Sequence, residues 1–177
     1  AKAAIDLALT DWVTQRLGVP LYRYLGLDPE QAPPTSMSIG IDRPEMTKQK
    51  VREAADFPIL KIKVGLDSDE ATIAAVRQVS SQRLRVDANE GWKDREEALR
   101  KLKWLATQNV EFVEQPMAAE RIDDQRWLHE RSPLPLFADE ACLHAEAIPA
   151  LASLYDGIVV KLDKCGGLTE ALAMADT

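Results

Sequence analysis

Hydrophobic and polar positions follow two different periods along most of this chain. Short apolar or alternating segments are separated by longer segments in which apolar residues recur every three or four positions. The first pattern predicts β-strands and the second predicts amphipathic helices. The predicted strands are residues 35–41, 60–64, 84–87, 110–114, 134–139 and 157–162. The predicted helices that follow them are residues 44–56, 68–80, 94–108, 122–131, 144–154 and 168–175.

The segment before the first strand has a helical period. Residues 3–17 predict a helix with Ile5, Leu9, Trp12 and Val13 on one face and a glycine just past its end. Residues 22–26 continue it, and residues 28–34 form a turn-rich loop.

The strict alternation of strand and helix predicts a parallel α/β architecture, because parallel strands need crossover helices. We expect a (β/α) barrel of the TIM type, here incomplete and covering about six strands. No shift in composition marks a second domain, so residues 1–177 are predicted to be one barrel segment. The chain has no initiator methionine and ends within a predicted helix, so both ends look internal.

Charged residues occupy one face of the predicted strands, although buried parallel strands are usually apolar on both faces. Lys61 and Lys63 share a face, and Asp87, Glu114 and Asp139 end the next three strands. At the last predicted strand, residues 157–162, Lys161 shares a face with Val159 and with Asp163 just beyond it. Taken singly, each is more often a solvated edge residue or a helix N-cap. Five strands with charges in phase instead predict an active site at the carboxyl ends of barrel strands.

Three carboxylates on neighbouring strands make an oxygen-rich site that suits Mg²⁺. Asp87, Glu114 and Asp139 are therefore the candidate metal ligands. Asn89 and Glu140 follow two of them closely and are candidates for orienting them. The lysines would supply proton transfer. His129 and His144 fall in predicted helices and are expected at the surface.

Composition narrows the classes of partner. The formal net charge is −7, and no block of Lys/Arg is present. Nucleic acid and anionic membranes are therefore poor partners, and a small molecule or a cation is favoured. No segment has the roughly 20 apolar residues that span a bilayer. The two cysteines, Cys142 and Cys165, are too few for a disulfide framework and fit a cytoplasmic protein.

The strand-end motifs, taken together, resemble those of the enolase superfamily. They are Lys61-Ile-Lys63, Asp87-Ala-Asn89, Val113-Glu-Gln-Pro116, Ala138-Asp-Glu140 and Val160-Lys-Leu162. Their order and spacing are similar to those of the muconate-lactonising-enzyme branch. The segments 35–40, 87–92 and 161–167 look most like those of its dipeptide epimerases.

The resemblance implies roles for individual residues. Asp87, Glu114 and Asp139 match the metal ligands, Lys63 and Lys161 match the two acid/base lysines, and Lys61 would support the charge balance. Strands two and six lie opposite each other in an eight-stranded barrel, so the two lysines would flank the substrate α-carbon. One would remove the α-proton and the other would return a proton to the opposite face, through an enediolate stabilised by Mg²⁺.

This family resemblance predicts an isomerase, an epimerase or racemase acting on a small carboxylate such as the dipeptide L-Ala-D/L-Glu, and it allows a homo-oligomer. The family's N-terminal capping domain and its seventh and eighth strands have no counterpart in these residues, and the eighth strand carries its substrate-selecting acidic residues. Other activities of the branch, o-succinylbenzoate synthase and N-acylamino acid racemase, therefore stay open. A non-catalytic barrel fragment is a further alternative, although it predicts the loss of at least one of the charged positions.

Overall fold

The computed structural model describes residues 1–177 as two compact units. The first unit consists of residues 1–34, 142–149 and 160–177, and the second of residues 35–141 and 150–159. That both belong to one barrel domain stays a prediction.

The second unit is built on a six-stranded parallel sheet with the strand order β1-β2-β3-β4-β5-β6. Its strands are β1 (Ser36–Ile39), β2 (Ile59–Lys63), β3 (Arg83–Asp87), β4 (Val110–Glu114), β5 (Leu136–Ala138) and β6 (Gly157–Ile158). The sheet is open, because β1 and β6 each have one neighbour. The predicted parallel α/β order is thus confirmed, and the open sheet matches an incomplete barrel.

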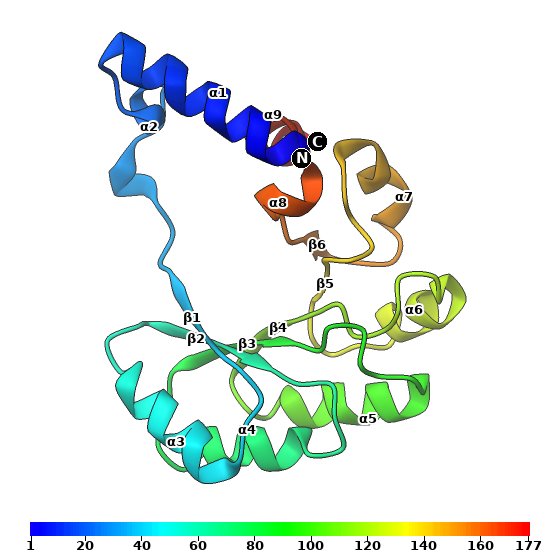
Figure 1. The fold of residues 1–177 in the computed structure, drawn as a ribbon. Helices are drawn as coiled ribbons and strands as arrows, with labels where there is room; N and C mark the ends of the chain where they lie inside the picture. The colour runs from blue at the N-terminus through cyan, green and yellow to red at the C-terminus, as the bar shows by residue number, and fades with distance from the viewer. The chain divides into compact units, whose positions relative to one another are not determined.

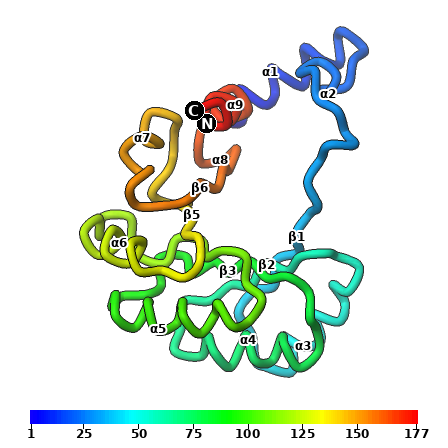
Figure 2. The backbone as a smooth tube through the Cα atoms, turned by 180° about the vertical axis from the view of Figure 1, so that it is seen from behind, coloured from blue at the N-terminus to red at the C-terminus, as the bar shows by residue number.

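Four helices of this unit connect successive strands. They are α3 (Pro44–Glu53), α4 (Asp69–Arg77), α5 (Arg95–Leu105) and α6 (Ile122–His129). Figures 1 and 2 show α3, α4 and α5 along the same side of β1–β4. The strand residues that alternate toward this layer are fully buried and apolar: Leu60, Ile62, Leu84, Val86 and Val113. This core leaves the other strand face to the charged residues, as the period of two predicts.

The first unit is helical. Its elements are α1 (Lys2–Leu17), α2 (Leu21–Tyr24), η1 (Pro29–Gln31), η2 (Ala145–Ala147), α8 (Leu162–Cys165) and α9 (Leu168–Asp176), and α7 (Ile148–Leu151) begins in it. Asp6 of α1 accepts hydrogen bonds from the backbone N–H and the hydroxyl of Thr169, at 3.2 and 2.6 Å. These hydrogen bonds lower the pKa of the Asp6 carboxyl. They join α1 to the first turn of α9.

The face of α1 that contacts its unit differs from the predicted apolar face. Ile5, Leu9 and Trp12 are 62%, 59% and 61% exposed. Val13 is the member of the predicted face that is partly buried, and it lies with Asp6, Thr10 and Thr14, which also recur at helical spacing and are more buried. The hydrogen bonds between Asp6 and Thr169 lie on this more buried face, and apolar periodicity alone does not predict them.

Two predicted elements near the chain's end are shorter than expected. The helix predicted over residues 144–154 is divided into η2 and α7. Pro149 lacks the N–H that a continuous α-helix would need there. The strand predicted over residues 157–162 ends at Ile158, and Leu162 begins α8. None of the helices has the length and apolar character needed to cross a lipid bilayer.

A buried ion pair links the loops that follow β2 and β3. The Asp69 carboxylate accepts hydrogen bonds from the backbone N–H groups of Gly65 and Leu66, each at 2.8 Å. It also accepts from Trp92 Nε1 and Lys101 Nζ, both at 2.8 Å. The side chains of Asp69 and Lys101 are only 7% and 10% exposed. One carboxylate therefore joins the loop after β2, the loop after β3 and helix α5.

Replacing Asp69 with alanine should destabilise the protein by about 3 kcal/mol or more, because a buried ammonium group would lose its partner. The measurement is the free energy of unfolding from urea denaturation. Glu70→Ala is the matched control, because neighbouring Glu70 pairs with Arg100 at the surface. The free energy of unfolding of the Glu70→Ala variant should stay close to the wild-type value, because an exposed ion pair contributes little to stability. Equal effects of the two substitutions would show that the Asp69 network does not stabilise the fold.

Candidate metal and acid/base site

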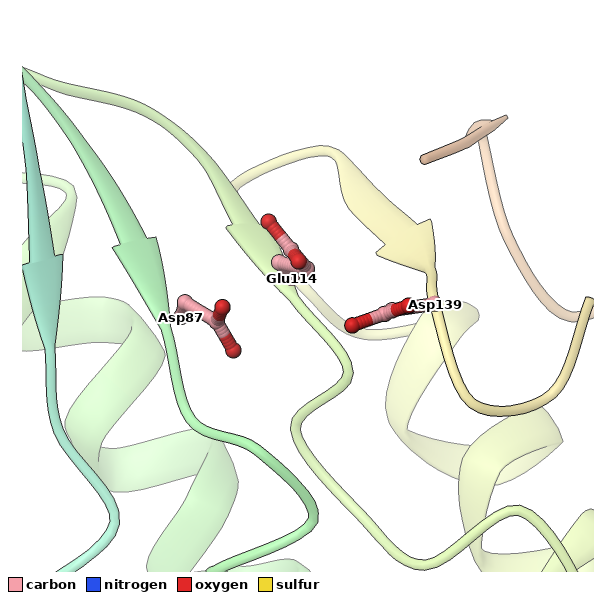
Figure 3. Close-up of side chains that lie close together, drawn as sticks. All are labelled: Asp87, Glu114 and Asp139. Carbon is pink, nitrogen blue, oxygen red and sulfur yellow. The ribbon is translucent and has the colours of Figure 1, made fainter. Parts of the chain in front are cut away.

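Three carboxylates meet at the carboxyl ends of β3, β4 and β5. Asp87 and Glu114 are the last residues of their strands and face each other in the sheet register, and Asp139 directly follows β5. One oxygen from each lies within 4.8 Å of the others (Figure 3). The three residues are 0%, 2% and 1% exposed. The structure thus brings together the three residues that the sequence predicted as a cluster.

Two lysines of β2 lie on the same side of the sheet and pair with this cluster. Lys61 Nζ is 2.9 Å from Asp87 Oδ2 and 2.5 Å from Glu114 Oε2. Lys63 Nζ is 2.5 Å from Asp87 Oδ2 and 2.6 Å from Asn89 Oδ1. Lys63, Asp87 and Glu114 occupy one level of the sheet, since each is the register partner of the next. The predicted phase of the charged residues on these strands is confirmed.

The protonation of the cluster follows from burial and from these pairs. Burial acts to lower the pKa of Lys61, but its hydrogen bonds to Glu114 and Asp87 raise the pKa overall. Burial acts to raise the pKa of Asp87, but the hydrogen bonds from Lys63 and Lys61 lower it overall. Burial and the neighbouring charge of Asp87 raise the pKa of Glu114 despite its contact with Lys61. The two lysines therefore offset part of the negative charge that the fold concentrates here.

The predicted supporting residues, Asn89 and Glu140, lie beside the ligand candidates. The backbone N–H of Asn89 donates to Asp87 Oδ1 at 3.0 Å, and its side-chain oxygen accepts from Lys63. Its Nδ2 lies 3.5 Å from Glu140 Oε1. Asn89 has a positive φ of 43°, a conformation that asparagine adopts more readily than most residues. Asn89 thus contacts a ligand candidate, a lysine and Glu140.

Gln115 is a structural centre of the site that sequence reasoning missed. Its side chain is fully buried, and its Oε1 accepts from the backbone N–H groups of Asp139 and Ala141 at 2.9 and 3.2 Å. Its Nε2 donates to the carbonyl of Met117 and to the Tyr155 hydroxyl, both at 2.9 Å. Burial raises the pKa of Tyr155 to about 12, so the hydroxyl stays neutral at physiological pH. The sequence signals were its position directly after Glu114 and its place in the strand-end motif Val113-Glu-Gln-Pro116.

Aromatic side chains share the strand face that carries the carboxylates. Phe112 and Phe137 stand two residues before Glu114 and Asp139, and their rings stack with centroids 4.1 Å apart. The guanidinium of Arg85 lies 5.3 Å from the Phe112 ring centroid, and its Nε is 2.9 Å from Glu111. The stacked pair therefore connects β4 and β5 on the face that carries Glu114 and Asp139.

Lys161 belongs to the first unit, where it is the extended N-cap residue of α8 rather than a residue of a strand. Its role opposite Lys63 stays a prediction. His129 Nε2 lies 3.2 Å from Asp156, and His144 is exposed, so neither belongs to the carboxylate cluster. Cys142 and Cys165 are buried free thiols, as expected.

The residues present fit a hard divalent cation. The cluster offers only carboxylate oxygens, which Mg²⁺ prefers, and it contains no histidine or cysteine that would favour zinc. Burying three carboxylates together is unfavourable unless positive charge compensates them. Asp87, Glu114 and Asp139 are therefore suited to hold Mg²⁺.

The fold and the site define part of a (β/α) barrel with charged groups at the carboxyl ends of its strands. The chain belongs to the Enolase C-terminal domain-like family, whose model matches residues 45–177. The resemblance to the enolase superfamily noted in the strand-end motifs is thereby confirmed.

Individual relatives carry more specific names. The L-Ala-D/L-Glu epimerase of Bacteroides thetaiotaomicron is 45% identical over 175 residues, which cover 98% of this chain and 46% of the relative. The hydrophobic dipeptide epimerase of Flavobacteria bacterium is 37% identical, over all of this chain and 53% of the relative.

A solved structure shares the fold closely. It is the dipeptide epimerase from Enterococcus faecalis V583 complexed with Mg and the dipeptide L-Leu-L-Tyr. Its TM-score is 0.90 at 35% identity, over 99% of this chain and 51% of that one. The chain thus spans about half the length of the relatives it matches, and these relatives are isomerases.

Proposed function

We propose that the protein containing this chain is a Mg²⁺-dependent epimerase that moves the α-proton of a dipeptide. The observation that carries the proposal is the buried cluster of Asp87, Glu114 and Asp139 with Lys61 and Lys63 beside it. Abstraction of a proton next to a carboxylate creates negative charge that must be stabilised, and it needs a positioned base. The cluster and the lysines supply groups for both needs.

In this proposal the three carboxylates hold Mg²⁺, which when bound neutralises negative charge on the substrate's carboxylate. Lys63 is the acid/base on one face of the α-carbon, and Asn89 orients its ammonium group through the 2.6 Å hydrogen bond. Lys61 pairs with Asp87 and Glu114 and balances the charge of the cluster. Glu140 supports Asn89.

Lys161 is the second acid/base in the proposal. Its support is the sequence order, because strands two and six lie opposite each other in a closed eight-stranded barrel. Two bases on opposite faces of one carbon allow a proton to leave from one face and another to arrive on the other. That arrangement serves epimerisation in both directions, whereas an elimination needs only one of the lysines as a base.

The names of the relatives support a dipeptide as substrate, and we propose the same class for this protein. The test is an assay of the purified full-length protein with L-Ala-L-Glu, hydrophobic L,L-dipeptides and N-acylamino acids. We expect epimerisation of a dipeptide that stops when EDTA removes the metal and returns when Mg²⁺ is added. Activity that is confined to N-acylamino acids would contradict the proposed substrate class. Undiminished activity in EDTA would contradict the metal requirement.

A further inference from the structure

The three carboxylates of the cluster are held in different ways. Asp87 and Glu114 are strand residues, and the sheet register fixes their backbones. Asp139 lies one residue beyond the end of β5, where the strand pairing with β4 has stopped. Its backbone N–H donates to a side chain, Gln115 Oε1, instead of to a neighbouring strand. The position of the third carboxylate therefore depends on Gln115.

Gln115 can position Asp139 relative to Glu114 because it contacts both the end of β4 and the segment that contains Asp139. It directly follows Glu114, and its own N–H donates to the carbonyl of Phe137 in β5 at 2.8 Å. Its side-chain oxygen reaches forward to the N–H groups of Asp139 and Ala141. One residue thus connects the end of β4 with the backbone on both sides of Asp139.

The hydrogen-bonding capacity of the Gln115 side chain is fully used. A primary amide has two acceptor positions and two donor hydrogens. Gln115 Oε1 accepts from the backbone N–H groups of Asp139 and Ala141. Its Nε2 donates one hydrogen to the Met117 carbonyl and the other to the Tyr155 hydroxyl. Asparagine is one methylene shorter, and methionine fills a similar volume without making any of these bonds. The positive φ of 36° at Gln115 is uncommon for a residue other than glycine, and these contacts hold the backbone in that conformation.

We propose that Gln115 is a positioning residue that sets the place of Asp139 relative to Glu114 and so determines how tightly and how selectively the cluster binds Mg²⁺. The proposal rests on the proposed metal site. Groups that orient metal ligands from behind commonly change metal affinity by about 10–100-fold when they are removed. Tyr155 extends the same network, because its hydroxyl accepts from Gln115 Nε2.

The test compares Gln115→Met with Gln125→Met in the full-length protein by titration calorimetry with Mg²⁺ and with Ca²⁺. Gln125 is a matched control: it is almost as buried, and its Nε2 donates to the carbonyl of Leu154 instead of to Tyr155 or to a residue of the carboxylate cluster. We expect Gln115→Met to weaken Mg²⁺ binding about 10–100-fold. Ca²⁺ binding should fall less, because Ca²⁺ tolerates irregular geometry better than Mg²⁺. Gln125→Met should leave both affinities at the wild-type level.

The outcomes separate the two proposals. If the wild-type protein binds no Mg²⁺, the metal site itself is wrong. If the wild type binds Mg²⁺ and folded Gln115→Met binds it equally well, only the role of Gln115 is wrong. An equal loss of Mg²⁺ and Ca²⁺ affinity in both glutamine variants would indicate a general effect on the fold. That result would also contradict the proposed role of Gln115. Should Gln115→Met fail to fold, Tyr155→Phe takes its place, with several-fold weaker Mg²⁺ binding expected and a wild-type affinity contradicting the proposal.

Discussion

Replacing Lys63 with alanine is expected to abolish interconversion of the two substrate stereoisomers, lowering kcat by about 10³-fold or more. Lys63 is the lysine of β2 that reaches both Asp87 and Asn89, and no neighbouring group on that strand face duplicates its contact with Asn89. Without it, no base serves one face of the α-carbon. Polarimetry or chiral chromatography of a dipeptide reaction measures the loss.

Isotope exchange makes this prediction more specific. If Lys161 serves the other face, Lys63→Ala should still exchange the α-proton of one stereoisomer with D₂O while failing to convert it. Lys161→Ala should exchange the α-proton of the other stereoisomer with D₂O and should also fail to convert it. The control is Lys48→Ala, because Lys48 lies in α3 and pairs with Glu45 of the same helix. Wild-type interconversion by either active-site variant would refute the two-lysine mechanism.

Replacing Glu114 with glutamine is expected to weaken Mg²⁺ binding by more than about 100-fold, a larger effect than loss of an orienting partner. Glutamine keeps the shape of the side chain but removes one of three charges from the buried cluster. It also removes the charge that pairs with Lys61 at 2.5 Å. Titration calorimetry gives the affinity, and circular dichroism checks that the variant is folded.

The matched control for this substitution lies on the same strand. Glu111 of β4 pairs with Arg83 and Arg85 instead of contacting the carboxylate cluster. Glu111→Gln should therefore bind Mg²⁺ with wild-type affinity. An equal loss of affinity in both variants would show that the effect comes from the net charge of the strand rather than from a ligand, and would contradict the assignment of Glu114.

The sheet and its charged face could be predicted from sequence because both depend on short-range periodicity. The strand Val110–Glu114 has its predicted bounds, and the bounds of the strand ending at Asp87 differ by one residue. Once the strands are parallel and in order, residues at their carboxyl ends must meet at one edge of the sheet. This is why Asp87, Glu114 and Asp139 could be grouped from the sequence alone.

Other features depend on contacts between distant residues and could not be predicted in the same way. The buried face of α1 is set partly by Asp6 binding Thr169, which is far along the chain. Gln115 has no apolar or charge pattern that distinguishes it, and its importance appears only when its hydrogen-bond partners are known. The division of the helix predicted over residues 144–154 could have been predicted from Pro149, because a proline within a helix interrupts its hydrogen-bond pattern.

The measurement that tests the proposed function most directly is α-proton exchange by the full-length protein in D₂O with Mg²⁺ present. Proton NMR of L-Ala-L-Glu and of hydrophobic L,L-dipeptides would follow both the α-proton signal and the appearance of the second stereoisomer. We predict that solvent deuterium enters the α-position of the product as the stereoisomers interconvert, and that EDTA stops both changes. Full retention of the α-proton and of the starting stereochemistry in all these dipeptides, by folded protein with bound Mg²⁺, would contradict the assignment as a dipeptide epimerase.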